Sequence, residues 1–186
     1  GYDIGYEDNF HYSRILPSKL SEQDQTKLRH VASVGCKALG MKNSPAHVEI
    51  IMTKSGPRIV EIGARNGGYR ERMHKIANGI DIPGAALATY TNQRLNITAT
   101  KNEPCAVLEL FPRHPGVFKG LRNEERVRRL ESINYLSIKP EVGDVIGKSS
   151  DGHKAAAVIM LHNKDPEVFA ADLEFVNNNV AIETLS

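Results

Sequence analysis

Two β-rich runs, residues 47–53 and 57–64, constrain the fold of this chain more than any other feature. Both are rich in Ile and Val, which favour strands, and the Gly of the intervening tripeptide 54–56 suits the left-handed position of a three-residue hairpin loop. With that loop, Glu49 lies directly opposite Glu61. The sequence therefore predicts an antiparallel hairpin in which two carboxylates face each other.

The two glutamates share one face of this hairpin because side chains alternate along a strand. The opposite face is predicted to be apolar and to consist of Val48, Ile50, Met52, Val60 and Ile62. The face of the glutamates also carries Ile51, Ile59, Gly63 and Arg65. Such a mixed face is typical of the wall of a site.

Cross-strand partners have Cβ atoms about 4.5–5.5 Å apart, and like charges at that spacing destabilise the pair. A divalent cation, a nearby Arg or Lys, or solvation on an exposed face can each offset the repulsion between Glu49 and Glu61. The sequence leaves all three open. Two carboxylates suit Mg²⁺, which completes its octahedron with waters and with phosphates such as those of a nucleotide.

Further polar groups surround the carboxylates in sequence. Arg65 has the strand parity of the glutamates and can either grip a phosphoryl oxygen or form an ion pair with one of them. Gly67 and Gly68 let the backbone approach an anion at the start of a helix, although most such pairs are merely turns. His47 shares the strand face of Glu49, either as a hydrogen-bonded wall residue or as a ligand.

The rest of the sequence predicts an α+β fold in two domains, residues 1–97 and 98–186, separated by a polar stretch over 96–104. In the first domain we expect a short strand over 10–15 and helices over 22–39, 70–77 and 84–95. In the second we expect strands over 105–111, 116–121, 133–139 and 154–162, and helices over 124–130 and after Asp165-Pro166. The prediction is an antiparallel sheet with flanking helices, followed by a small α+β domain.

Charge and composition exclude several classes of partner. The chain carries 24 Lys and Arg against 22 Asp and Glu, a net charge of +2, so neither nucleic acid nor an anionic membrane is expected as a partner. The arginines of residues 122–129 alternate with glutamates, as on a solvated helix. The basic helix predicted over 70–77 fits an acidic substrate or a solvated face. Two cysteines without metal-like spacing and no bilayer-spanning apolar run predict a cytoplasmic protein.

The stretch 47–68, HVEIIMTKSGPRIVEIGARNGG, resembles the distal half of an ATP-grasp domain. In that family two acidic residues on adjacent antiparallel strands coordinate the Mg²⁺ bound to ATP, and an Arg after the second stabilises the transferring phosphoryl group or the acyl phosphate. The resemblance implies ATP with Mg²⁺, or Mn²⁺, as cofactor, with Glu49 and Glu61 as metal ligands and Arg65 as the catalytic residue. The other candidates for nucleotide contact are Gly67, Gly68 and His47.

Residues 63–68 resemble the branch that includes L-amino acid ligases and related carboxylate–amine ligases, and residues 104–183 look like the small C-terminal domain of that branch. The resemblance implies a ligase that joins a small-molecule carboxylate to an amine, or to a thiol, through an acyl phosphate. It also implies that a first ATP-grasp subdomain precedes Gly1, so that this chain alone is catalytically incomplete.

One residue departs from the family pattern. Many members carry Asn two positions after the second acid as another metal ligand, and Gly63 stands there in this chain. A weaker metal shell is implied, which leaves open a non-catalytic binding module on a degenerate ATP-grasp scaffold. A carbamoyl-phosphate synthase-like or biotin carboxylase-like member is a further alternative, because the reaction type rests on analogy.

Overall fold

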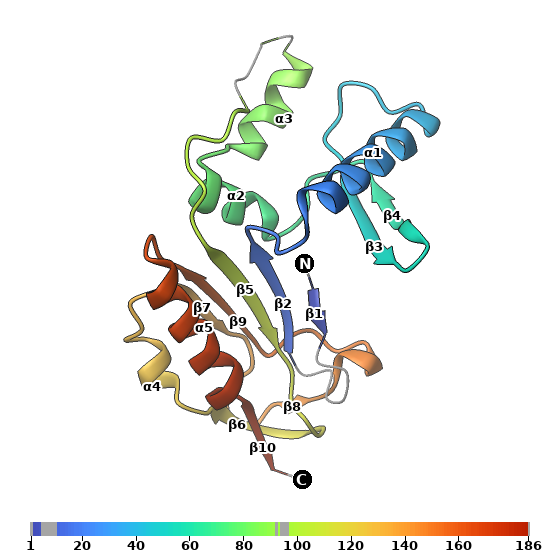
Figure 1. Cartoon of the computed structure of the whole chain (residues 1–186). Helices are drawn as coiled ribbons and strands as arrows, with labels where there is room; N and C mark the ends of the chain where they lie inside the picture. The colour runs from blue at the N-terminus through green and yellow to red at the C-terminus, as the bar shows by residue number, and fades with distance from the viewer. Residues whose placement is uncertain (1, 5–10, 92, 94–96, 186) are drawn as a thin grey trace. The chain divides into compact units, whose positions relative to one another are not determined.

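The computed structural model describes residues 2–4, 11–91, 93 and 97–185 (Figure 1). The chain divides into two compact units, one of residues 18–101 and the other of residues 1–17 together with 102–186. Both are α+β with antiparallel strands and helices beside them, as predicted. In the part of the chain that the structure describes, no helix is long and apolar enough to cross a bilayer.

The unit of residues 18–101 contains a helix, a hairpin and two further helices. In chain order these are α1 (Glu22–Ala38), β3 (His47–Thr53), β4 (Gly56–Gly63), α2 (Arg70–Asn78) and α3 (Ile82–Tyr90). Local signals set their ends: the hydroxyl of Ser21 accepts the Asp24 amide at 3.1 Å and caps α1, and Gly79 ends α2 in a left-handed conformation.

Helix α3 begins two residues before its predicted start at residue 84, because the carboxylate of Asp81 caps it by accepting the Gly84 amide. Pro83 takes one of the first helical positions, where its missing N–H costs no hydrogen bond. At the other end of the predicted helix, residues 92, 94 and 95 lie outside the described residues.

The β3–β4 hairpin differs from its prediction at the turn. Thr53 pairs with Gly56, so the loop consists of residues 54–55 and not of three residues. The register then shifts between the pair Ile50–Ile59 and the pair Glu49–Glu61, which leaves Val60 unpaired as a bulge. The shorter loop and the added bulge residue cancel each other, so the two glutamates face each other as predicted.

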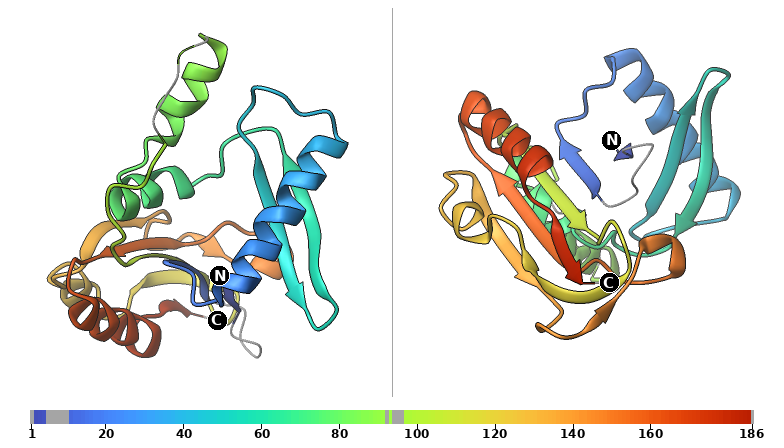
Figure 2. Two further views of the ribbon diagram at one scale, coloured as in Figure 1. Left: turned by 45° about the horizontal axis from the view of Figure 1, so that its top comes forward. Right: turned by 90° about the horizontal axis from the view of Figure 1, so that it is seen from below.

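The bulge also changes which side chains face α1. A Cβ built on Gly35 of α1 would lie 2.6 Å from Ile59 Cδ1 and 2.8 Å from Ile62 Cδ1, so both isoleucines point at the helix. The prediction that Ile59 lies on the glutamate face was therefore wrong, because simple alternation does not hold across a bulge. Helix α1 covers this face of the hairpin (Figure 2).

The other unit is built on two sheets. The larger has the order β1-β2-β5-β9-β7, with β1 (Tyr2–Ile4), β2 (His11–Leu16), β5 (Cys105–Leu110), β9 (Ala157–His162) and β7 (Ile133–Ile138). The smaller has the order β10-β6-β8, with β10 (Ile182–Leu185), β6 (Gly116–Leu121) and β8 (Val145–Ile146). Helices α4 (Glu124–Val127) and α5 (Pro166–Asn179) and the 3-10 turn η1 (Ser149–Asp151) complete the unit.

The core of this unit lies between the larger sheet and α5, which runs across one face of that sheet (Figure 2). It is formed by Leu108 and Leu110 of β5, Ile159 and Leu161 of β9, and Phe169 and Val176 of α5, among others. Alternate residues of β5 and β9 face the helix, as expected for strands with one face in a core.

The division into units differs from the predicted domains 1–97 and 98–186. Strand β2 was placed in the first domain, yet it pairs with β5 along its whole length, from His11 opposite Leu110 to Leu16 opposite Cys105. Residue 10, the predicted start of this strand, lies outside the described residues. Strands β1, β8 and β10 were not predicted, because each is short, and β8 and β10 also pair with β6, which is distant in sequence.

Candidate active site

Glu49 and Glu61 extend from one face of the β3–β4 hairpin as register partners. Their side chains are 34% and 55% exposed, so solvent reaches both carboxylates. Two hard oxygen donors on adjacent strands, open to water, are thus brought together as the sequence predicted.

His47 and Arg70 are basic neighbours of Glu49. The Nε2 atom of His47 lies 3.0 Å from Glu49 Oε1, and Nη2 of Arg70 lies 3.6 Å from the same oxygen. His47 is two residues away on β3 and therefore on the same face, whereas Arg70 begins α2. The carboxylate of Glu49 is therefore fixed in place more firmly than that of Glu61.

Glu61 has a basic neighbour of its own. Nη2 of Arg65 donates to Glu61 Oε1 at 3.4 Å, and Nη1 of Arg65 donates to the backbone oxygen of Asn66 at 3.0 Å. The side chains of Arg65 and Glu61 are both more than half exposed, at 60% and 55%. An ion pair this long and this exposed is weak, and a ligand can displace it at little cost.

These contacts answer the question of charge repulsion. The cation–carboxylate pairs at Glu49 and at Glu61 offset the repulsion between the two glutamates, which is the second of the three arrangements left open by the sequence. Proximity of the two carboxylates therefore does not by itself demand a shared divalent ion. A metal role of the pair depends on the donor set and on the fold.

The two glycines after β4 differ in their surroundings. Gly67 is buried, and a Cβ built on it would lie 2.7 Å from Nδ1 of His47 and 3.0 Å from Cδ of Arg70. Gly68 is exposed and has a φ of +37°, which disfavours other residues. The amide of Arg70 is engaged, since it donates to Gly67 O at 2.9 Å. That amide is therefore not available to bind an anion at this helix start.

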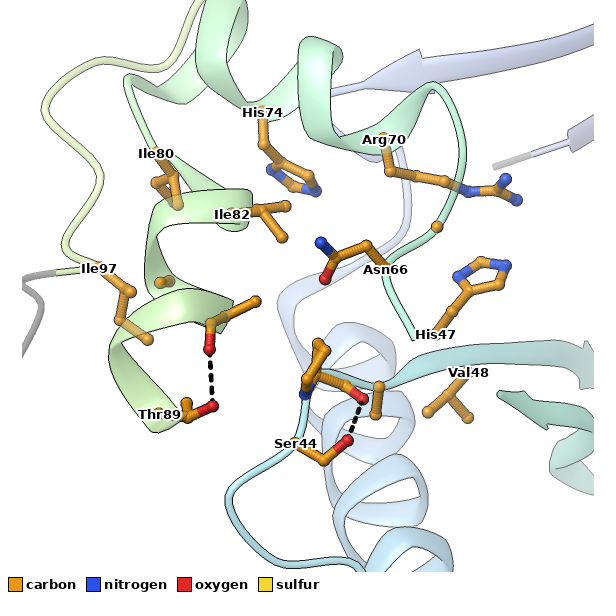
Figure 3. Close-up of a pocket in the computed structure, with 15 residues that line it drawn as sticks. Ser44, His47, Val48, Asn66, Arg70, His74, Ile80, Ile82, Thr89 and Ile97 are labelled. Atoms are coloured by element: carbon orange, nitrogen blue, oxygen red, sulfur yellow. Dashed lines mark hydrogen bonds between the residues drawn. The ribbon is translucent and has the colours of Figure 1, made fainter. Parts of the chain in front are cut away.

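A pocket of about 480 Å³ opens beside the carboxylate pair, within the unit of residues 18–101 (Figure 3). One side is formed by the segment 44–48, and the other by α2, α3 and the loop between them. Its apolar lining includes Ile80, Ile82, Ala85, Ala86 and Ile97, and its polar lining includes His47, Asn66, Arg70 and His74. Of the predicted site residues, His47 and Gly67 line this pocket, whereas Arg65 and both glutamates do not.

Arg70, His74 and Asn66 are site residues that the sequence did not single out. Arg70 and His74 lie one turn apart on α2, so their side chains share a helix face, and that spacing is the available signal. In Figure 3 the side chain of Asn66 lies between the α2 side and the Ser44 side of the pocket. Its Oδ1 atom is buried and accepts no hydrogen bond from any residue that the structure describes.

The carboxylates of Glu49 and Glu61 suit a magnesium ion whose other ligands are waters and phosphates. Among the described residues no group of three or more His, Cys, Asp or Glu side chains is placed to hold a metal. Mg²⁺ is usually bound through one or two carboxylates, with waters and substrate phosphates in the remaining positions. Glu49 and Glu61 supply such a pair, and waters or phosphates would fill the remaining positions.

The arginines of residues 122–129 make contacts with nearby side chains. Ion pairs join Arg122 to Glu183, Arg128 to Glu124 and Arg129 to Glu125, and the guanidinium of Arg126 lies 4.0 Å from the centre of the Phe175 ring. This is the arrangement expected of a solvated, charge-alternating surface.

The fold is shared with solved structures of ligases and carboxylases. L-amino acid ligase from Bacillus licheniformis superposes with a TM-score of 0.79 at 19% identity, over 95% of this chain and 44% of its own. Phosphoribosylglycinamide synthetase from Anaerococcus prevotii superposes with a TM-score of 0.67 at 17% identity, over 95% of this chain and 45% of its own.

The biotin carboxylase domain of 2-oxoglutarate carboxylase from Hydrogenobacter thermophilus, solved with MgADP, ADP and bicarbonate, has a TM-score of 0.52 at 13% identity and covers 95% of this chain and 40% of its own. These proteins are ATP-grasp enzymes, so the resemblance noted in residues 47–68 is confirmed at the level of the fold. No family model and no curated protein matches the sequence. The chain spans less than half the length of the solved structures named here.

Proposed function

We propose that this chain is part of an ATP-dependent ligase that joins a carboxylate to an amine through an acyl phosphate. One observation carries the proposal: Glu49 and Glu61 face each other on a hairpin of the ATP-grasp fold, with Arg65 beside them. A fold alone does not define an activity, because proteins of many activities share one fold. These three residues, however, combine metal-binding oxygens with a guanidinium that can reach a phosphoryl group.

In this proposal Glu49 and Glu61 hold a Mg²⁺ or Mn²⁺ ion together with the phosphates of ATP. When bound, such an ion draws charge from the phosphate oxygens. Arg65 leaves its weak contact with Glu61 and stabilises the negative charge of the transferring phosphoryl group. The backbone around Gly67 and Gly68 approaches the nucleotide.

The solved relatives support the proposed substrate class. The TM-score of 0.79 to an L-amino acid ligase, against 0.52 to a biotin carboxylase domain, supports the carboxylate–amine branch over the carboxylase-like one. The relatives are about twice as long as this chain, which supports a further ATP-grasp region that supplies the rest of the nucleotide site. We place the reaction in the cytoplasm, where ATP and small carboxylates are available.

The test is phosphate release by a protein that contains this chain together with the preceding ATP-grasp region. We expect release of ADP and phosphate on addition of a carboxylate and an amine, and we expect Glu61→Gln to abolish it while far-ultraviolet circular dichroism stays unchanged. Arg58→Ala, an exposed substitution on the same strand, serves as the control and should retain full turnover. Full turnover by Glu61→Gln would overturn the proposal.

The second candidate is a non-catalytic binding module on the same scaffold. Gly63 favours it, because a backbone position without a side-chain oxygen cannot supply the third ligand that many members use. The phosphate-release experiment separates the two: a module of this kind releases no phosphate with any carboxylate and amine, in the unsubstituted protein as in Glu61→Gln.

A further inference from the structure

His47 stands between a buried glycine and one of the two site carboxylates. Its ring is 13% exposed, its Nε2 atom lies 3.0 Å from Glu49 Oε1, and its Nδ1 atom faces Gly67. In Figure 3 its ring projects from the β3 strand toward the loop that carries Gly67. The ring is thus confined on one side and hydrogen-bonded on the other.

The direction of the hydrogen bond follows from the chemistry of the two groups. An ionised carboxylate only accepts hydrogen bonds, so Nε2 of His47 carries the proton and donates it to Glu49. A donor fixed by burial restricts the rotation of the carboxylate it contacts. Arg70 adds positive charge to the same oxygen at 3.6 Å.

The space for the ring exists only because residue 67 has no side chain. A Cβ there would lie 2.7 Å from Nδ1 of His47, closer than real Cβ contacts, and 3.0 Å from its Cγ, which is tighter than most of them. The ring would have to turn away, and Nε2 would leave Glu49. The absence of a side chain at Gly67 therefore serves the histidine, beyond any close approach of the backbone to a ligand.

We propose that His47 is a positioning residue that holds the Glu49 carboxylate in its metal-binding orientation, and that Gly67 is required to seat the His47 ring. This inference rests on the proposed function, since it assigns the contact a purpose at the metal. Groups that hydrogen-bond to metal ligands orient them, and their loss typically weakens metal binding by about 10–100-fold.

The experiment is a titration of the chain with Mn²⁺ alone, with free Mn²⁺ counted by its electron paramagnetic resonance signal. Glu61→Gln defines the background from other carboxylates. We expect His47→Phe, which keeps a ring but has no donor, to bind Mn²⁺ about tenfold more weakly than the unsubstituted chain. His47→Gln, which places a donor nitrogen near the position of Nε2, should restore most of the affinity, which a purely structural role of the ring would not predict.

Gly67→Ala provides a second route to the same result. It should weaken Mn²⁺ binding like His47→Phe, whereas Gly63→Ala, whose Cβ would meet only ordinary contacts at 3.5 Å, should not. If His47→Phe fails to fold by circular dichroism, Gly67→Ala and His47→Gln decide the question. Equal affinity of His47→Phe, or of Gly67→Ala, and the unsubstituted chain would overturn the positioning role. Absence of any Mn²⁺ binding above the Glu61→Gln background would instead overturn the metal site itself, and with it the proposed function.

Discussion

Glu49 is the register partner of Glu61 although β3 and β4 slip by one residue immediately beside this pair. The bulge at Val60 lets the same strand present Ile59 and Ile62 to α1 and Glu61 to the open face. A regular strand would place Ile59 and Ile62 on opposite faces, because the side-chain period is two. The local irregularity thus lets one strand serve the packing and the site together.

We expect Arg65 to contribute strongly to turnover and hardly at all to the free energy of unfolding. Its pair with Glu61 is long and exposed, so Arg65→Ala should change the free energy of unfolding by only about 0–1 kcal/mol. In the longer protein, loss of a guanidinium that stabilises phosphoryl transfer should lower turnover on the order of a thousandfold. Chemical denaturation and phosphate release measure the two effects, and Arg58→Ala is the exposed control on β4. A large loss of stability with little loss of turnover would contradict the assigned role.

Gly63→Asn should strengthen metal binding. A Cβ at this position meets Arg65 Cγ at 3.5 Å, an ordinary contact, so the hairpin has room for the side chain. The amide oxygen adds a hard donor near Glu49 and Glu61, and the affinity of such sites rises with the number of oxygen ligands. Mn²⁺ titration should show several-fold tighter binding, with Gly63→Ala unchanged. If Asn and Ala behave alike, the donor is not reaching the metal.

Local signals in the sequence were sufficient to predict the helices and strands around the candidate site. Hairpin composition, the Ser21 cap and the Gly79 stop depend on neighbouring residues, so β3, β4, α1 and α2 could be predicted. The facing of Glu49 and Glu61 was predicted from a wrong loop length that the bulge happened to correct.

Contacts between distant residues could not be predicted in the same way. The pairing of β2 with β5 depends on strands far apart in the sequence, and no periodicity within residues 1–20 encodes it. Arg70 reaches Glu49 because the Gly67-Gly68 turn sets where α2 begins, which depends on backbone angles that residue type alone does not specify. The basic neighbours of the glutamates were accordingly left open at the sequence level.

The N-terminal cap of α1 gives a prediction for pH dependence. Lys27, and then Ser21, donate hydrogen bonds to the carboxylate of Asp24 and hold its pKa below the ordinary value. Because the folded-state pKa is lowered, this contribution to stability is present above the unfolded pKa and disappears as the pH falls through the folded one. Lys27→Met should raise the pKa of Asp24 in a carboxyl-detected nuclear magnetic resonance titration. No change on that substitution would contradict the assigned cause.

Alanine substitutions at two glycines that follow helices distinguish the cost of backbone strain from the cost of a steric clash. Gly40 and Gly79 both have left-handed φ values, +68° and +74°. Within the described residues a Cβ on Gly40 would meet nothing within 4 Å, whereas one on Gly79 would clash with Oγ1 of Thr100. Gly40→Ala should therefore cost only about 1 kcal/mol of stability from the backbone conformation. Gly79→Ala should cost more, because Thr100 must also move. Thermal unfolding of the two variants measures the difference, and equal losses would show that Thr100 yields freely.

Paramagnetic broadening by Mn²⁺ tests most directly whether Glu49 and Glu61 together hold a divalent ion. In the ¹⁵N-labelled chain, low Mn²⁺ should first broaden the amide signals of β3 and β4 around the two glutamates, while those of α5 stay sharp. Either Glu49→Gln or Glu61→Gln should remove this selective broadening. Broadening spread over acidic residues throughout the chain, or unchanged in both variants, would contradict the claim.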